Sequence, residues 1–151
     1  MYFTPHITVA TIVEQQGRFL LVEERADNQI VINQPAGHVE IGEHILEAAG
    51  RETMEETGWQ VEPTYLVGIY FYTAPHNQVT YLRLCFAAKA LQHIAHATLD
   101  KEIIQPLWLS IEELQQRQTA WRSPLVMKCI EDYQAGQRYP LTAIYDHRFA
   151  L

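Results

Sequence analysis

Residues 37–59 read GHVEIGEHILEAAGRETMEETGW, a glycine-containing bend followed by a helix rich in carboxylates. Helical spacing of three and four residues places Glu52, Glu55 and Glu56 side by side on one face. Like charges at this spacing destabilise an isolated helix by roughly a few tenths of a kcal/mol per pair. A divalent cation would offset the repulsion, and proteins bind Mg²⁺ through one or two carboxylates together with substrate phosphates. The stretch therefore predicts a cation site on one helix face.

The helix is expected over residues 43–57, because apolar residues recur there at helical spacing. Gly58 follows directly and suits a left-handed C-cap. Gly50 lies inside the helix, where glycine costs about 1 kcal/mol relative to alanine. We interpret Gly50 as a sign of close packing against a strand.

The other segments predict mainly β-structure. Residues 7–14 and 18–25 are rich in alternating apolar and β-branched residues around a Gln-Gly pair, which predicts a hairpin. Residues 61–73 and 79–90 predict a second, longer hairpin, and residues 107–109 a short strand. The order of strands and helices indicates an α/β protein with a mixed sheet packed between helices.

Two further helices are expected near the C-terminus. Ser110 and Glu113 have the spacing of a capping box, which predicts a helix start after residue 110. A last helix is expected over residues 124–135, with Ser123 as its N-cap and Gly136 at its C-terminal end.

Length and composition limit the class of protein. A chain of 151 residues with 48% hydrophobic residues predicts a single domain over residues 1–151. The net charge of −7 argues against a nucleic-acid partner, which would need a clustered basic face. The sequence has no signal peptide pattern and no transmembrane run, so no membrane partner is expected. Cys85 and Cys129 match no metal-ligand spacing and suit core positions in a reduced, cytoplasmic protein.

The opening stretch also resembles a known motif. Gly37, then Glu43 six places on, then the run from Arg51 to Trp59 match the Nudix box, G-x5-E-x7-R-E-U-x-E-E-x-G-U, in all seven invariant letters. Thr53 fills a position that is usually aliphatic. The resemblance implies the Nudix-type α/β/α sandwich with a mixed central β-sheet, covering nearly the whole chain.

The same resemblance implies a metal-dependent attack of water on a diphosphate-containing small molecule. Glu52, Glu55 and Glu56 would be ligands of Mg²⁺, with Mn²⁺ as an alternative ion, and the backbone carbonyl of Gly37 would join them. Arg51 would support the site by pairing with carboxylates, as its bidentate guanidinium allows.

A later loop is expected to add one more carboxylate. Glu102 precedes the 107–109 strand and is our candidate for a ligand or water-orienting group. The general base stays open between Glu52 and Glu102.

Other residues are candidates for contacts with the substrate. Arg83, Arg122 and His38 are candidate phosphate contacts. Four aromatic residues of the second hairpin are expected more often in the core or on a sheet face than as ring-stacking platforms: Tyr70, Phe71, Tyr72 and Tyr81. Ile32 stands where many Nudix proteins have Trp, which argues against a stacking partner at that position.

Segments outside the box, including NQPAGH at residues 33–38, resemble a bacterial phosphatase subgroup of the family. This implies release of terminal phosphate from nucleoside tri- and diphosphates and thiamine-type pyrophosphates. A pyrophosphatase acting on ADP-ribose or nucleoside triphosphates is the enzymatic alternative, and a non-catalytic nucleotide-binding module is the alternative of another class. A monomer or a homodimer is expected.

Overall fold

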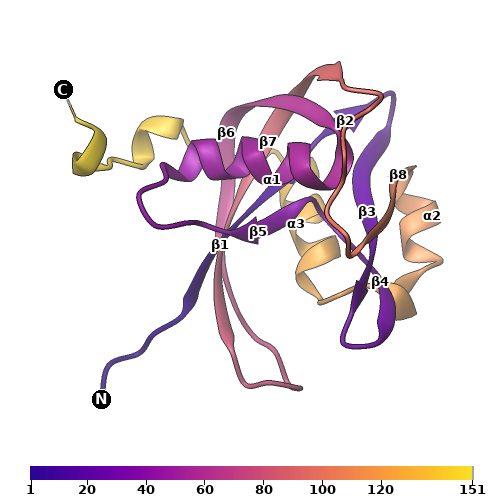
Figure 1. Cartoon of the computed structure of the whole chain (residues 1–151), viewed down its shortest axis with the longest axis horizontal. Helices are drawn as coiled ribbons and strands as arrows, with labels where there is room; N and C mark the ends of the chain where they lie inside the picture. The colour runs from indigo at the N-terminus through magenta and orange to yellow at the C-terminus, as the bar shows by residue number, and fades with distance from the viewer. Residues whose placement is uncertain (151) are drawn as a thin grey trace.

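The computed structural model describes residues 1–150 of the chain, with strands in two sheets and helices on both sides of one of them (Figure 1). The strands are β1 His6–Ile12, β2 Glu14–Gln15, β3 Arg18–Ala26, β4 Gln29–Asn33, β5 Ala36–His38, β6 Trp59–Thr73, β7 Thr80–His93 and β8 Ile103–Leu109. The helices are α1 Ile45–Thr57, α2 Ile111–Gln115 and α3 Leu125–Gln134, with 3₁₀ turns at Gln118–Ala120, Leu141–Ala143 and His147–Phe149. Within this range, no helix combines the length and the apolar character needed to cross a bilayer.

The first sheet is mixed, as the sequence predicted. Its strand order is β5-β1-β7-β6, in which β1 pairs parallel to β7 and antiparallel to β5. The second sheet contains β2, β3 and β4, and β8 pairs with β3 on the side that β4 leaves free. The hairpin predicted for the second half of the chain is confirmed, because β6 and β7 pair antiparallel along their whole length.

The first predicted hairpin is wrong in its pairing. Strand β1 belongs to the first sheet and β3 to the second, and only Glu14–Gln15 pairs with the start of β3. The chain crosses between the sheets at Val13, whose carbonyl accepts a hydrogen bond from Leu20 N at 2.9 Å. The physical reason is burial: β1 is buried from Thr8 onward and mostly apolar there, and such a strand gains most when both of its edges are paired inside a sheet.

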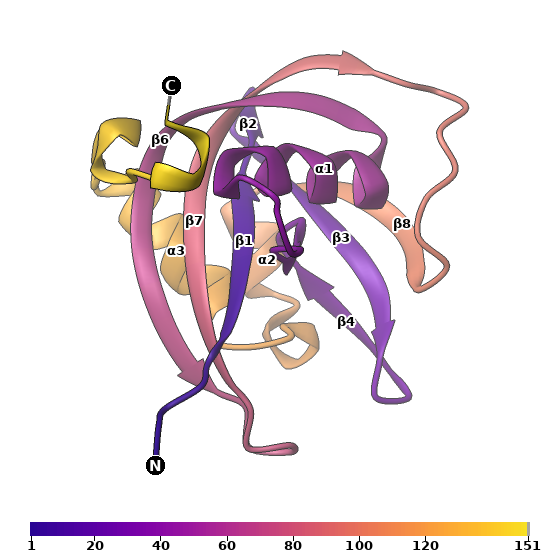
Figure 2. The ribbon, with the colours of Figure 1, turned by 60° about the vertical axis from the view of Figure 1, so that its left-hand side comes forward.

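Helices cover both faces of the first sheet (Figure 2). On one face, Ala48 and Ala49 of α1 pack against Val9, Leu84 and Phe86. On the other face, α3 and the second sheet form the larger core cluster, to which Val126 and Ile130 contribute from α3. This layering agrees with the expected α/β/α arrangement.

The predicted helix ends are close to the observed ones. Helix α1 begins at Ile45, where the side chain of His44 accepts a hydrogen bond from Leu46 N, and it ends at Gly58 with φ of 75°. The capping box of Ser110 and Glu113 is present at the start of α2. The interpretation of Gly50 is wrong, because a Cβ atom there would meet nothing within 4 Å.

Candidate metal and phosphate site

A cavity of about 360 Å³ opens between α1, the first sheet and the segment before α3. Its wall includes Glu52 and Glu56 from α1, Gly37 from β5, Arg83 from β7 and Arg122 from the segment before α3. Carboxylates and guanidinium groups therefore face one common space, which suits a ligand carrying phosphates together with a cation.

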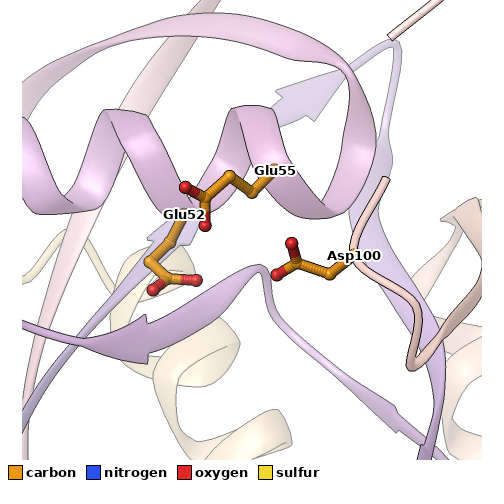
Figure 3. Close-up of side chains that lie close together, drawn as sticks. All are labelled: Glu52, Glu55 and Asp100. Atoms are coloured by element: carbon orange, nitrogen blue, oxygen red, sulfur yellow. The ribbon is translucent and has the colours of Figure 1, made fainter. Parts of the chain in front are cut away.

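Three carboxylates form a cluster beside this cavity (Figure 3). Glu52, Glu55 and Asp100 each offer an oxygen atom, and the three atoms lie within 4.8 Å of one another. Two of the residues lie on consecutive turns of α1, whereas Asp100 comes from the loop before β8. The loop is held to the helix by a hydrogen bond from Asp100 N to the carbonyl oxygen of Glu55 at 2.9 Å.

The structure does not bring Glu102 into this cluster. Its carboxylate is half exposed and lies 3.9 Å from Lys101 Nζ, while its backbone carbonyl accepts a hydrogen bond from Arg25 N. Sequence reasoning placed a carboxylate of this loop near the helix but chose Glu102 in place of Asp100. The backbone bond between Asp100 and Glu55 holds Asp100 beside α1, whereas the backbone of Glu102 is bonded to Arg25.

Gly37 allows the close approach of β5 to α1. A Cβ atom at this position would lie 2.1 Å from Cδ of Glu52 and 2.3 Å from each of its carboxylate oxygens. Real Cβ atoms do not come so close to other atoms, so only glycine fits while Glu52 keeps this position.

Arg51 holds the acidic groups in place. Its guanidinium donates to both carboxylate oxygens of Glu43, at 2.6 and 3.0 Å, and to Glu52 at 2.9 Å. It also donates to Glu55 at 3.1 Å and to the backbone carbonyl of His38 at 3.0 Å. The hydrogen bonds from Arg51 lower the pKa of Glu43, and the same bonds raise the pKa of Arg51. One planar side chain thus fixes three carboxylates and the strand beside them.

Glu56 is the most buried carboxylate of the helix face. Its side chain accepts a hydrogen bond from Ala36 N at 2.8 Å, and the residue is only 7% exposed. Burial raises the pKa of Glu56 to about 9 and also raises the pKa of Glu52. Glu56 lies outside the three-carboxylate cluster, although it lines the same cavity as Glu52.

The donor set fits a hard divalent cation. Carboxylate oxygens are the ligands that Mg²⁺ and Mn²⁺ prefer, and this wall offers several of them with no sulfur or imidazole ligand in the cluster among residues 1–150. Burial raises the pKa of Glu56, and it raises the pKa of Glu52 despite the hydrogen bond from Arg51, so a cation bound between them would favour their ionised forms.

The candidate phosphate contacts differ in their partners. Arg83 is 7% exposed and donates to the side-chain oxygens of Gln34 at 2.9 Å and Asn33 at 3.1 Å. Arg122 forms an ion pair with Glu24, and no sequence signal indicated this pair between residues 98 positions apart. His38 lies 3.0 Å from the ring of His6, and burial lowers the pKa of His38. All three candidates line the cavity.

The tyrosines of β6 and β7 have different environments. Tyr70 is buried and donates to Asp132 on α3 at 2.8 Å, as expected for a core residue. Tyr72 and Tyr81 instead line the cavity.

Comparison with known proteins gives consistent matches. The family model of the Nudix domain matches residues 3–129. The chain is 42% identical over 144 residues to the protein named Phosphatase NudJ of Escherichia coli (strain K12), a match that covers 95% of this chain and 93% of the relative. The protein of the same name from Shigella flexneri matches with the same values.

Solved structures show the same fold. A Nudix hydrolase from Nitrosomonas europaea superposes with a TM-score of 0.94 at 44% identity, covering 97% of this chain and 100% of that chain. A MutT Nudix hydrolase from Burkholderia pseudomallei has a TM-score of 0.73 at 20% identity, covering 86% of this chain and 98% of that chain.

Proposed function

The chain belongs to the Nudix family and is a hydrolase of phosphoanhydrides, and from this premise we propose that it removes the terminal phosphate of its substrates with the help of a divalent cation. The proposed substrates are nucleoside tri- and diphosphates and thiamine-type pyrophosphates. One observation carries the proposal: the carboxylate cluster of Glu52, Glu55 and Asp100 lies beside a cavity that also contains two arginines. The similarity to a protein named as a phosphatase supports the choice of product.

Mg²⁺, or Mn²⁺ in its place, would be held by Glu52, Glu55, Glu56 and Asp100 together with the carbonyl of Gly37. When bound, such an ion neutralises charge that develops on phosphate oxygens and makes water a better nucleophile. We propose Asp100 for the role that the sequence assigned to Glu102, because its carboxylate is the one that faces α1.

The residues of the chain supply orientation and proton acceptance. Arg51 keeps the carboxylates of Glu52 and Glu55 in fixed rotamers, since one guanidinium bonds to both. A carboxylate at the site accepts a proton from the attacking water. We propose two candidates for this base, Glu52 and the loop carboxylate Asp100, and the pH–rate profiles of Glu52→Gln and Asp100→Asn should show which variant loses the acidic limb.

The same features support our proposals for the compartment and the partner. Cys85 and Cys129 are both free and buried, which supports a reduced, cytoplasmic setting. The cavity wall of carboxylates and arginines supports a small phosphoanhydride as the partner.

Product analysis tests the proposed function. Phosphate release would be measured with Mg²⁺ on ATP, ADP, thiamine pyrophosphate and ADP-ribose, with and without added inorganic pyrophosphatase. The proposal expects phosphate from ATP, ADP and thiamine pyrophosphate without the added enzyme. Phosphate that appears only after the enzyme is added, or AMP and ribose 5-phosphate formed from ADP-ribose and detected by chromatography, would identify a pyrophosphatase. Absence of every one of these products would identify a binding module.

Hydrolysis in ¹⁸O-labelled water gives an independent test. Attack on the terminal phosphorus puts the label into inorganic phosphate, whereas attack on an inner phosphorus puts it into the organic product or into pyrophosphate. Glu56→Gln serves as the low-activity control, since we expect loss of this carboxylate to reduce the rate by about 10²-fold or more.

A further inference from the structure

The register of the first sheet arranges the cavity floor in two rows. Thr8 on β1 is the pairing partner of both His38 on β5 and Arg83 on β7, so these three residues lie in one row. Two strand spacings, about 10 Å, separate the backbones of His38 and Arg83. The row therefore runs from β5, which lies beside the carboxylates of α1, to the buried guanidinium of Arg83.

The second row is aromatic. Tyr81 on β7 pairs with His6 on β1 and with Tyr72 on β6. Tyr81 and Arg83 are two residues apart on one strand, so their side chains lie on the same face, about 7 Å apart along the strand. The rings of His6 and His38 contact the Tyr81 ring edge to face, at centroid distances of 5.6 and 6.2 Å. Tyr81 is thus held from one side, while both tyrosines line the cavity.

Arg83 carries a charge that the protein itself does not neutralise. Its guanidinium is bonded to two neutral amide side chains and lies 4.0 Å from the sulfur of Cys129, and within residues 1–150 it has no carboxylate oxygen within 4.0 Å. A buried guanidinium without an anion is costly unless a partner arrives. Gln34, which accepts one of these hydrogen bonds, is itself held in place, because its side chain donates to the carbonyl of Val126 on α3 at 2.6 Å. This second bond helps to fix the position of the Arg83 guanidinium.

We infer that this floor is a divided substrate site. Arg83 binds the phosphate that stays with the organic product, and Tyr81 and Tyr72 form a platform for a planar aromatic ring of the substrate. The reacting phosphate then lies toward the carboxylates of α1, and the ring lies two residues along β7 from Arg83. The inference rests on the proposed function for the class of substrate and for the phosphate that is released.

Arg122 has a different role from Arg83 in this arrangement. It is half exposed and already paired with Glu24, so its charge is compensated before any ligand binds. We therefore expect Arg83 to contribute more than Arg122 to phosphate affinity.

Binding without turnover tests the inference. Isothermal titration calorimetry in EDTA would measure three probes: AMP, thiamine monophosphate and ribose 5-phosphate, which has the phosphate without an aromatic ring. The wild-type chain should bind at least one of the two aromatic probes about tenfold more tightly than ribose 5-phosphate. Tyr81→Ala and Tyr72→Ala should remove that advantage and leave ribose 5-phosphate binding unchanged.

Substitutions of Arg83 test the proposed phosphate contact. Arg83→Gln should weaken all three probes by roughly 10- to 100-fold, because it removes charged hydrogen bonds to phosphate. Arg83→Lys keeps the charge and should bind the probes more tightly than Arg83→Gln. This comparison separates loss of the charge from a general disturbance of packing. Thermal unfolding of each variant would be measured alongside.

Matched controls lie outside the cavity. Tyr145→Ala removes an exposed tyrosine, and Arg138→Gln removes an arginine that stacks 4.1 Å above the ring of Tyr65. Both should bind the probes as the wild type does. Two results would overturn the inference. One is a wild-type affinity for AMP and thiamine monophosphate that is no greater than that for ribose 5-phosphate, and the other is unchanged phosphate affinity in a folded Arg83→Gln variant. Release of pyrophosphate in the Mg²⁺ assay would overturn the proposed function while leaving these binding results in force.

Discussion

Gly37 lies so close to Glu52 that a Cβ atom on residue 37 would stand 2.1 Å from the carboxylate carbon. Gly37→Ala should therefore displace the Glu52 carboxylate from its bond with Arg51 and reduce kcat by about 10- to 100-fold, the range typical for disturbed metal-site support. Because the clash is with the end of a flexible side chain, stability should fall only slightly. Steady-state kinetics and thermal unfolding check both expectations.

Gly50→Ala is the matched control on the same helix. A Cβ atom there meets nothing within 4 Å, so alanine should stabilise the protein by about 1 kcal/mol through better helix propensity. Activity should remain at the wild-type level. Equal loss of activity in both glycine variants would argue against a specific contact between Gly37 and Glu52.

Asp100 and Glu102 form a natural pair for comparison, since they lie in one loop and only Asp100 faces α1. Asp100→Asn should lower kcat by about 10²-fold and raise the Mg²⁺ concentration needed for half-maximal activity. Glu102→Gln should leave both quantities close to those of the wild type. A Mg²⁺ titration of activity measures them, and the reverse order of effects would restore Glu102 to the site.

Arg51 contacts Glu43, Glu52 and Glu55 with one rigid guanidinium. Lysine retains the charge but cannot reach several carboxylates at fixed angles, so Arg51→Lys should reduce kcat by about tenfold or more while KM changes little. Lys128→Arg, at a half-exposed lysine paired with Asp132, is a control for the reverse exchange and should have no effect on activity. A change confined to KM in Arg51→Lys would contradict a role in positioning the carboxylates.

Thr53, the residue that replaces an aliphatic side chain in the motif, is explained by Thr11. The two hydroxyl oxygens lie 2.8 Å apart, and the Thr53 hydroxyl also donates to the carbonyl of Ala49 at 2.8 Å. The single proton of Thr53 is thus used, and Thr11 must donate to Thr53. Thr53→Val should cost about 1–3 kcal/mol by leaving the Thr11 hydroxyl unpaired, whereas Thr11→Val should cost less.

The double variant completes this cycle. With both hydroxyls replaced by methyl groups, no buried polar group is left unpaired, so the double variant should be more stable than Thr53→Val alone. Denaturant unfolding of the four proteins measures the coupling. Simple addition of the two single effects would show that the hydroxyls do not interact.

The burial of Glu56 predicts how stability depends on pH when metal is removed. Burial raises its pKa in the folded chain from the ordinary 4.5 to about 9. The protonated form is therefore favoured by folding, and this contribution is fully present below about pH 4.5 and is lost as the pH rises toward about 9. In EDTA, the melting temperature should fall over this range by more in the wild type than in Glu56→Gln.

Added Mg²⁺ should reduce this fall, because a cation favours the ionised carboxylate and stabilises the folded state that binds it. Thermal unfolding between pH 5 and 9, with EDTA and with Mg²⁺, tests both statements. Parallel curves for the wild type and Glu56→Gln would show that Glu56 does not titrate with the expected shift.

The sequence predicted the site residues on α1 more accurately than it predicted the site residue that comes from a loop. Spacing along a helix is fixed by its geometry, so the placement of Glu52, Glu55 and Glu56 on one side of α1 followed from residue numbers alone. The direction of a side chain in an irregular loop depends on individual backbone hydrogen bonds. For this reason the sequence indicated a carboxylate near residue 100 but not that Asp100, held through its own N–H, is the one that faces the helix.

By itself, the sequence determined the family, the carboxylate helix, the long β6–β7 hairpin and the acidic character of the site, because each depends on local periodicity or on a fixed motif. Only the tertiary structure decided that β1 pairs with β5 and β7 and not with β3, and that Arg83 lies buried between two neutral amides. These features arise from contacts between residues far apart in the chain. Their energies depend on burial and register, which no local pattern records.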